Sequence, residues 1–158
     1  MQPTTGPRPG GPLRVLFLCT GNACRSQIAE AWARHLKADV VEPYSAGTHP
    51  RGLDPLAVKA MAEVGIDMSG QPSKGIADIE HIPFDYVVTV CSDAHEACPV
   101  FPGCAQVMHV GFDDPPRLAA TATSEAEALL HYRRVRDEIR AFIEQFPHVL
   151  ETTARRNV

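Results

Sequence analysis

The sequence has neither a long apolar run nor an excess of positive charge. None of its apolar stretches approaches the roughly 18 to 20 residues of a membrane-spanning helix, and no charged-then-apolar signal sequence opens the chain. The formal net charge of -4 leaves no electrostatic footprint for nucleic acid or an anionic membrane. We therefore expect a cytoplasmic protein, monomeric by default, that binds neither nucleic acid nor membranes.

The sequence also lacks an even number of cysteines. Without a secretion signal, the odd count makes a static disulfide framework a poor interpretation and favours thiols that react or bind metal. The five cysteines are Cys19, Cys24, Cys91, Cys98 and Cys104. The last three have the spacing C-x6-C-x5-C, unlike the paired C-x2-4-C of structural zinc sites. A zinc site completed by His95 and His109 is therefore the lesser alternative, and we expect no metal and no cofactor.

The composition predicts one folded domain. A chain of 158 residues that is 44% apolar can bury a single sizeable core. Seven of the first twelve residues are proline or glycine, which restricts regular structure, and the tail ETTARRNV looks similarly loose. We expect a disordered leader over 1–12, a folded domain over 13–148 and a flexible tail over 149–158.

Short apolar runs alternate with helical patterns along this domain. Four valine-rich runs bounded by turn residues are typical of buried strands. They span 13–18, 39–45, 84–90 and 105–110. Helical spacing follows over 28–36, over 55–64 after the cap Asp54, and from the capping box Ser124-x-x-Glu127 to Pro147.

This alternation predicts an α/β fold. We expect a three-layer sandwich in which a four-stranded parallel sheet carries helices on both faces. Ligands of such sheets bind beyond the carboxyl ends of the strands, and Cys19 and Cys91 each follow a predicted strand.

The loop CTGNACRS, residues 19–26, joins the first strand to the first helix. Backbone N–H groups and the positive helix end converge there on one point, which makes an anion site. A helix N-terminus, the nearby Arg25 and the Ser26 hydroxyl are conditions that lower a thiol pKa, so Cys19 is the candidate nucleophile. Arg25 suits two oxygens of a tetrahedral oxyanion, and Gly21 and Asn22 tolerate the positive φ of a tight cradle.

The simpler interpretation is that Cys19 merely ends a buried strand, but the spacing C-x5-R-S between strand and helix argues against it. Cys24 has no comparable argument, and we interpret it as a loop filler with possible secondary reactivity as the open alternative. The predicted oxyanion-binding residues are Thr20, Gly21, Asn22, Ala23, Cys24, Arg25 and Ser26.

The stretch CTGNACRSQIAEAW resembles the phosphate-binding loop of the low-molecular-weight protein tyrosine phosphatase superfamily, and more closely that of its thioredoxin-coupled arsenate reductase branch. The similarity runs from about residue 13 to about residue 146, through YSAGTH, VVTVCSDAHEACP and GFDDPP. The loop alone identifies the superfamily, whereas Cys91 and Cys98 select the branch.

The resemblance implies a relay of three thiols. Cys19 would attack arsenate, Cys91 would attack the Cys19–arsenic adduct and release arsenite, and Cys98 would resolve the Cys19–Cys91 disulfide. Thioredoxin would then reduce the Cys91–Cys98 disulfide. Cys91 and Cys98 lie seven residues apart, so they can meet only if the segment between them bends, which favours a mobile loop. Inert loop cysteines are the alternative.

An acid is expected in GFDDPPR, residues 111–117, on a proline-stiffened loop after the last strand. Its two aspartates lie at the same sheet edge as Cys19, and an acid here could protonate the leaving oxygen. The resemblance implies Asp114, the aspartate before the proline, with Asp113 as the fallback and an Asp-Pro turn without chemistry as the alternative.

Other functions stay open at this point. The same residues would serve a phosphatase, although no tyrosine follows the prolines of DDPPR to recognise an aromatic ester. A thiol sensor without turnover is the third possibility. Asn22 and Ser45 resemble family positions that shape the loop or hold a monovalent cation, but Pro72 and Lys74 stand where cation ligands are expected, which argues against potassium activation.

Overall fold

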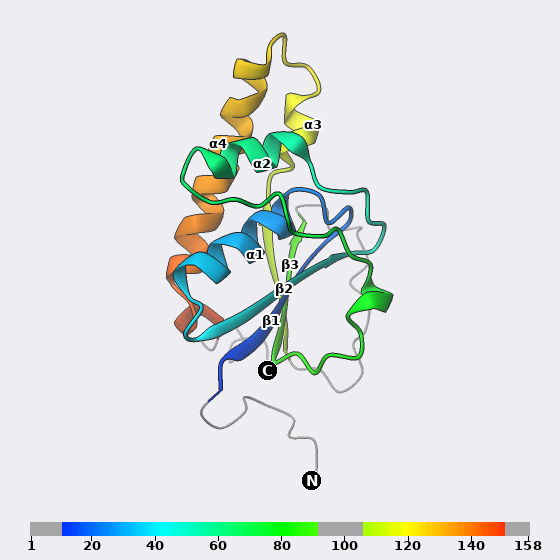
Figure 1. The fold of residues 1–158 in the computed structure, drawn as a ribbon, viewed down its shortest axis with the longest axis vertical. Coiled ribbons are helices and arrows are strands. Elements are labelled where there is room, and N and C mark those ends of the chain that lie inside the picture. The colour runs from blue at the N-terminus through cyan, green and yellow to red at the C-terminus, as the bar shows by residue number, and fades with distance from the viewer. Residues whose placement is uncertain (1–10, 92–105, 151–158) are drawn as a thin grey trace.

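Four parallel strands form the centre of the molecule in the computed structural model, which describes residues 11–91 and 106–150 (Figure 1). They are β1 (Leu13–Cys19), β2 (Val41–Gly47), β3 (Tyr86–Cys91) and β4 (Gln106–Phe112). The strand order is β2-β1-β3-β4, and every neighbouring pair is parallel. The predicted fold class is confirmed, and each predicted apolar run forms a strand, ending slightly later than expected.

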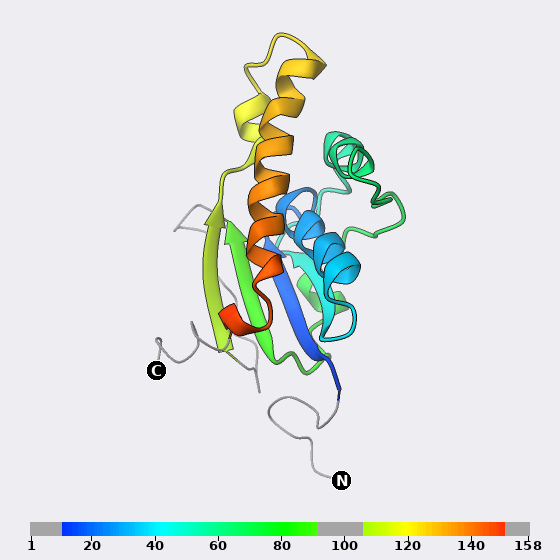
Figure 2. The same ribbon diagram turned by 90° about the vertical axis from the view of Figure 1, so that its left-hand side faces the viewer.

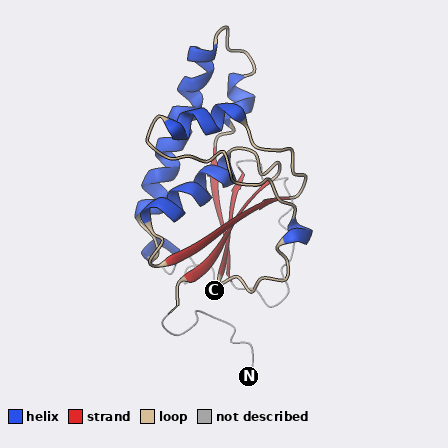
Figure 3. Ribbon diagram, in the orientation of Figure 1, coloured by secondary structure: helices blue, strands red, loops and turns tan. Residues whose placement is uncertain are grey.

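Helices cover the sheet unequally. They are α1 (Arg25–Leu36), α2 (Pro55–Ala62), α3 (Pro115–Ala119), α4 (Glu125–Glu144) and the short 3-10 helix η1 (Ile76–Asp78). Helices α1 and α4 lie side by side on one face, as Figure 2 shows. Within the described residues, the other face is covered by η1 and the chain that follows it. Figure 3 shows α2 and α3 beyond the carboxyl ends of the red strands.

The predicted caps hold α2 and α4. The Asp54 carboxylate accepts a hydrogen bond from the Leu56 N–H at 3.0 Å, and Gly65 turns the chain after α2 with φ of +82°. The Ser124 hydroxyl accepts from the Glu127 N–H at 3.1 Å. The Glu127 carboxylate does not return to Ser124 but accepts from the Thr123 N–H at 2.9 Å, so only half of the predicted capping box forms.

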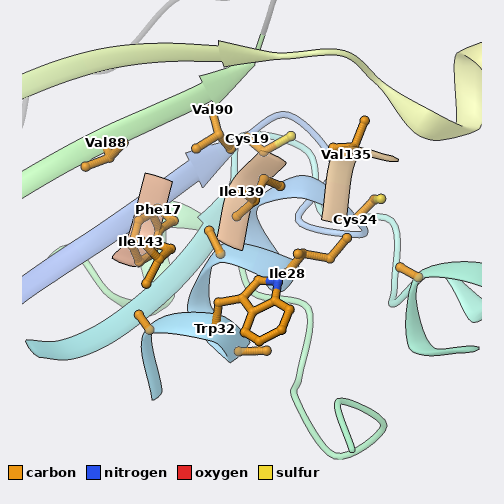
Figure 4. Close-up of a cluster of buried hydrophobic side chains, with 14 of the residues drawn as sticks. Phe17, Cys19, Cys24, Ile28, Trp32, Val88, Val90, Val135, Ile139 and Ile143 are labelled. Carbon is orange, nitrogen blue, oxygen red and sulfur yellow. The ribbon is translucent and has the colours of Figure 1, made fainter. Parts of the chain in front are cut away.

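The main core lies between the sheet and helices α1 and α4 (Figure 4). Phe17 of β1 and Ile139 of α4 are fully buried in it, and Cys19 and Cys24 belong to the same cluster. Leu16 and Leu18, which alternate with Phe17 and Cys19 along β1, pack in a second cluster on the other face. Strand β1 is thus buried on both faces, which is why it reads as a continuous apolar run.

Residues 1–10 of the predicted leader 1–12 and residues 151–158 of the predicted tail 149–158 lie outside the described residues. Of the helices in the described part of the chain, none has the length and apolar character required to cross a bilayer.

Candidate active site

A small pocket opens at the carboxyl end of β1, where the loop 20–24 leads into α1. Its volume is about 110 Å³. It is lined by Cys19, Thr20, Gly21, Ala23, Cys24, Arg25, Arg51, Asp114 and Pro116. Pockets for drug-sized ligands usually measure roughly 300 to 1,000 Å³, so this one suits a small ion.

The loop around the pocket is fastened through its carbonyl oxygens. The carbonyls of Cys19, Thr20, Gly21 and Ala23 accept hydrogen bonds from the N–H groups of Thr48, His49, Arg51 and Asp54, respectively, at 3.3, 2.8, 2.9 and 3.0 Å. In a trans peptide the next N–H points opposite to the carbonyl, so the loop amides that follow these carbonyls face away from the 48–54 segment. The loop therefore offers the backbone donors that an anion needs.

Gly47 makes this close approach possible. It ends β2, and a Cβ at this position would lie 2.5 Å from the carbonyl oxygen of Thr20 and 2.8 Å from the backbone nitrogen of Asn22. No side chain fits there without displacing the loop. The sequence pattern alone does not indicate this role of Gly47, because the contact joins segments that are far apart in the chain.

Asn22 is the internal anchor of the loop. Its φ is +44° and its side chain is fully buried. Its side-chain amide donates to the Ser26 hydroxyl at 2.9 Å, and its Oδ1 accepts from Gln27 Nε2 at 3.0 Å and from the Lys74 N–H at 2.7 Å. Gly21 does not share the positive φ that was expected of it. A Cβ on Gly21 would instead lie 3.3 Å from the Arg51 side chain.

Arg25 is the buried cation of the pocket. Its side chain is only 7% exposed, and Nη1 donates to the carbonyl oxygen of Phe112 at 3.2 Å. Its Nε lies 3.8 Å from Oδ1 of Asp114, the residue that precedes α3. Because Phe112 ends β4, the last strand holds the guanidinium of a residue that begins the first helix.

The two adjacent carboxylates of GFDDPPR diverge. Asp114 lines the pocket, whereas the Asp113 carboxylate accepts a hydrogen bond from Arg134 of α4 at 2.8 Å on the surface. The structure thus brings Asp114, and not the fallback Asp113, next to Cys19 and Arg25.

Cys91 lies beside the loop at the end of β3, the strand next to β1. Its Sγ is 3.9 Å from the Thr20 hydroxyl oxygen, and the residue is 6% exposed. Cys19, Cys24 and Cys91 are all buried. Cys98 lies outside the described residues, as do Cys104 and His95 of the alternative zinc site.

Cys24 has different surroundings from those of a reactive thiol. Burial raises the pKa of Cys24 well above its ordinary value, and the nearby charges of Asp54, Asp114 and Cys19 raise it further, against the opposite effect of Arg25. Cys24 is therefore a protonated thiol at neutral pH, in line with its interpretation as a loop filler.

Tyr132 of α4 supports the same part of the loop. Its hydroxyl donates to Oδ2 of Asp54 at 2.6 Å, while the Asp54 N–H holds the carbonyl of Ala23. Burial and this hydrogen bond raise the pKa of Tyr132, so it remains a donor. The sequence pattern indicated only that Tyr132 belongs to the apolar face of the last helix.

A buried carboxylate lies behind the loop. Glu30 is 3% exposed, and its Oε1 accepts a hydrogen bond from the Ser45 hydroxyl at 2.8 Å. The Lys74 ammonium lies 3.7 Å from the same oxygen and donates to the Pro72 carbonyl at 3.2 Å. The Lys74 ammonium therefore already supplies a positive charge beside Glu30 and its partner Ser45, the residue that resembles a monovalent-cation position.

Comparisons with known proteins agree on the family. The family model described as low molecular weight phosphotyrosine protein phosphatase matches residues 14–156. An arsenate reductase of Shouchella clausii is 48% identical over 136 residues, which cover 84% of this chain and 93% of that protein.

Solved structures of similar proteins include both reductases and a phosphatase. One described as an arsenate reductase in the phosphate binding state has a TM-score of 0.70 and 29% identity, and the match covers 84% of this chain and 95% of that one. For the YwlE arginine phosphatase from Geobacillus stearothermophilus, the TM-score is 0.68, the identity 27% and the coverage 89% and 94%. A thioredoxin-dependent arsenate reductase of Corynebacterium glutamicum has a TM-score of 0.57 and 28% identity, and the match covers 84% of this chain and 63% of that one.

The pocket of cysteine, arginine and aspartate at the strand ends, the loop C-x5-R-S and these matches agree with one another. The chain belongs to the low molecular weight phosphotyrosine protein phosphatase family.

Proposed function

We propose that this protein reduces arsenate to arsenite through a relay of Cys19, Cys91 and Cys98, with thioredoxin as the electron donor. The observation that carries the proposal is a second buried thiol, Cys91, against the loop that begins with Cys19. A simple hydrolase needs only the first thiol. The names of two relatives, arsenate reductases that are each 48% identical to this chain, support the same substrate.

The first step is attack by Cys19. The Cys19 thiolate forms a bond to arsenic, and one arsenate oxygen leaves as water after it has been protonated. Arg25 and the loop amides stabilise the charge on the remaining oxygens, as oxyanion-binding donors do. Asp114 lines the same pocket and is the proposed proton donor to the leaving oxygen.

The second step transfers two electrons to arsenic. The Cys91 thiolate attacks the Cys19 sulfur, a disulfide forms between them, and the sulfur–arsenic bond breaks with its electron pair on arsenic, which leaves as arsenite. β1 and β3 are adjacent parallel strands, Cys19 and Cys91 are their last residues, and both cysteines belong to the same buried cluster. This adjacency supports the step.

The third step regenerates Cys19. The Cys98 thiolate attacks the Cys91 sulfur, which frees Cys19 and leaves a Cys91–Cys98 disulfide. Thioredoxin reduces that disulfide with its own dithiol, so that the two electrons given to arsenic are replaced. The thioredoxin-dependent reductase among the structural neighbours supports this donor. We further propose that the protein acts as a monomer.

Hydrolysis of phosphate esters is the second candidate function. It is favoured by the family itself and by the arginine phosphatase among the structural neighbours. Phosphate and arsenate share shape and charge, so the pocket alone does not separate them. Pro116 lines the pocket beside Asp114, where a phosphatase would use an aromatic side chain to recognise its ester.

One preparation of the protein tests both functions. Arsenate-dependent oxidation of thioredoxin and hydrolysis of p-nitrophenyl phosphate are measured side by side, with Cys19→Ser as the control for both. We expect arsenate to drive thioredoxin oxidation while hydrolysis stays slow. Rapid hydrolysis without arsenite formation would replace the reductase by the phosphatase.

Potassium is not expected to activate the reaction. The Lys74 ammonium already lies beside Glu30 and the carbonyl of Pro72, and a second cation there would be repelled.

A further inference from the structure

Arg51 lines the oxyanion pocket but has no part in the steps described above. It lies between β2 and α2, and its backbone N–H donates to the carbonyl of Gly21 at 2.9 Å. Its side chain runs over the same residue, because a Cβ on Gly21 would lie 3.3 Å from Arg51 Cδ and 3.7 Å from Arg51 Nε. These contacts fasten an exposed guanidinium to the loop at the entrance of the pocket.

The charge of this guanidinium is needed in the pocket. Arg25 is already paired with Asp114, at 3.8 Å, and Cys19 adds a negative charge when it acts as a thiolate. Cys24 stays a neutral thiol because its pKa is raised. Without Arg51, the charges of Arg25 and the Cys19 thiolate cancel, so an incoming anion would meet pocket side chains with no net positive charge even when Asp114 holds the proton that it is proposed to donate.

Arg51 also differs from the arginines of α4 in its partners. Several arginines of α4 are held by carboxylates, such as Arg133 by Glu63 at 2.7 Å and Arg134 by Asp113 at 2.8 Å. No ion pair joins the Arg51 guanidinium to a carboxylate of residues 11–91 or 106–150. A forked, permanently charged donor next to loop amides is suited to the oxygens of a tetrahedral anion.

We propose that Arg51 is a second oxyanion-binding residue, which draws the anion into the pocket and raises its affinity. Arg51 is exposed at the entrance of the pocket, so its charge lowers the KM for the anion. Arg25 is buried, so its charge stabilises the reacting oxygens. The inference rests on the proposed function for the identity of the substrate, arsenate, but its charge argument holds for any anion of this shape.

Binding of inorganic phosphate, which thiols do not reduce, tests the proposal. Arg51→Met keeps a flexible stem over Gly21 and removes the charge. We expect the phosphate Kd to rise about three- to tenfold at low ionic strength, as measured by calorimetry, and the difference to shrink at high salt because a partly exposed charge is screened. Arg51→Lys should retain most of the affinity.

Lys37→Met is the matched control. It removes the same charge at the far end of α1, a 12-residue helix, about 18 Å from the loop, and should leave the phosphate Kd unchanged. In kinetics, Arg51→Met should raise the KM for arsenate by the factor seen for phosphate, with little change in kcat.

Two results would overturn the inference: a phosphate Kd for Arg51→Met equal to that of the unchanged protein at low salt, or an increase that is the same at every salt concentration. A protein that shows the salt-dependent Arg51 effect on phosphate but reduces no arsenate would contradict the proposed function and leave this inference standing.

Discussion

Asp113 and Asp114 are neighbours in the chain with different surroundings. The Asp113 side chain is 57% exposed and paired with Arg134, whereas Asp114 lies 3.8 Å from the buried Arg25. They follow β4 and precede α3, and successive side chains at the end of a strand point to opposite sides. The local backbone therefore separates a surface carboxylate from a pocket carboxylate.

Replacing each aspartate by asparagine should separate their roles. Asp114→Asn removes the proposed proton donor and should lower kcat for arsenate reduction by about 10²-fold, the usual contribution of a general acid. Asp113→Asn breaks an exposed ion pair worth less than about 1 kcal/mol and should leave kcat within about twofold. Steady-state kinetics on both variants checks this, and a larger loss in Asp113→Asn would reverse the assignment.

The sequence was sufficient for residues whose role is local. Cys19 and Arg25 share one contiguous loop, so their proximity in the pocket could be predicted from spacing alone. Gly47 and Arg51 could not be found in this way, because what they do depends on contact with a loop about thirty residues earlier. Only the folded chain brings the two segments together.

At the scale of elements, the loop depends on the segment after β2. Four loop carbonyls are held by N–H groups of residues 48–54, and Gly47 leaves room for them. α2 follows at once, capped by Asp54, which is also bonded to Tyr132 of α4. The oxyanion loop is thus fixed by backbone bonds to one neighbour and through it to the longest helix.

Gly47→Ala should disrupt this support. The added methyl group would lie 2.5 Å from the Thr20 carbonyl oxygen, so the loop must shift. We expect a loss of about 1 to 3 kcal/mol of folding free energy and much weaker phosphate binding. Urea denaturation and calorimetry measure the two effects. Gly70→Ala, where a Cβ meets nothing within 4 Å, is the control and should change neither; a Gly47→Ala protein with normal phosphate affinity would contradict the argument.

A second element contact predicts pH dependence. Hydrogen bonds from Arg133, then Arg136, both of α4, to Glu63 at the end of α2 lower the pKa of Glu63 from 4.5 to about 2. Because the folded pKa is depressed, the stabilisation is present above about pH 4.5 and is lost as the pH falls toward 2.

Glu63→Gln should therefore lower the urea midpoint at pH 7, and its difference from the unchanged protein should shrink between pH 4.5 and pH 2. Glu80→Gln removes an exposed charge that has no ion pair with residues 11–91 or 106–150 and is the control. A Glu63→Gln difference that does not change with pH would contradict the sign of the linkage.

Helices and strands could be predicted where they are long enough for the apolar pattern of the sequence to repeat. The four strands, α1, α2 and α4 were all indicated by their apolar patterns or caps. α3 and η1 have five and three residues, too few for a helical period to repeat, and α3 was expected as a proline-stiffened loop. Pro115, the first residue of α3, is typical of the first turn of a helix as well as of a loop or turn. The expectation of a loop was wrong here, because a short helix begins at this proline.

At the scale of the whole molecule, the strand order brings distant thiols together. Thr20 and Cys91 are 71 residues apart, yet the order β2-β1-β3-β4 makes their strands neighbours. The sequence indicated that Cys19 and Cys91 each follow a strand, but periodicity contains no information about which strands pair. The tertiary arrangement therefore supplies the adjacency on which the proposed relay depends.

The central claim is that this adjacency serves a disulfide relay, and single-turnover arsenite release by Cys98→Ser tests it most directly. The variant is mixed with excess arsenate, arsenite is quantified, and disulfides are mapped by mass spectrometry, with Cys91→Ser as the control. We predict about one arsenite per molecule, a Cys19–Cys91 disulfide and no turnover with thioredoxin for Cys98→Ser, and no arsenite for Cys91→Ser. Sustained thioredoxin-driven turnover by Cys98→Ser, or arsenite release by Cys91→Ser, would contradict the relay.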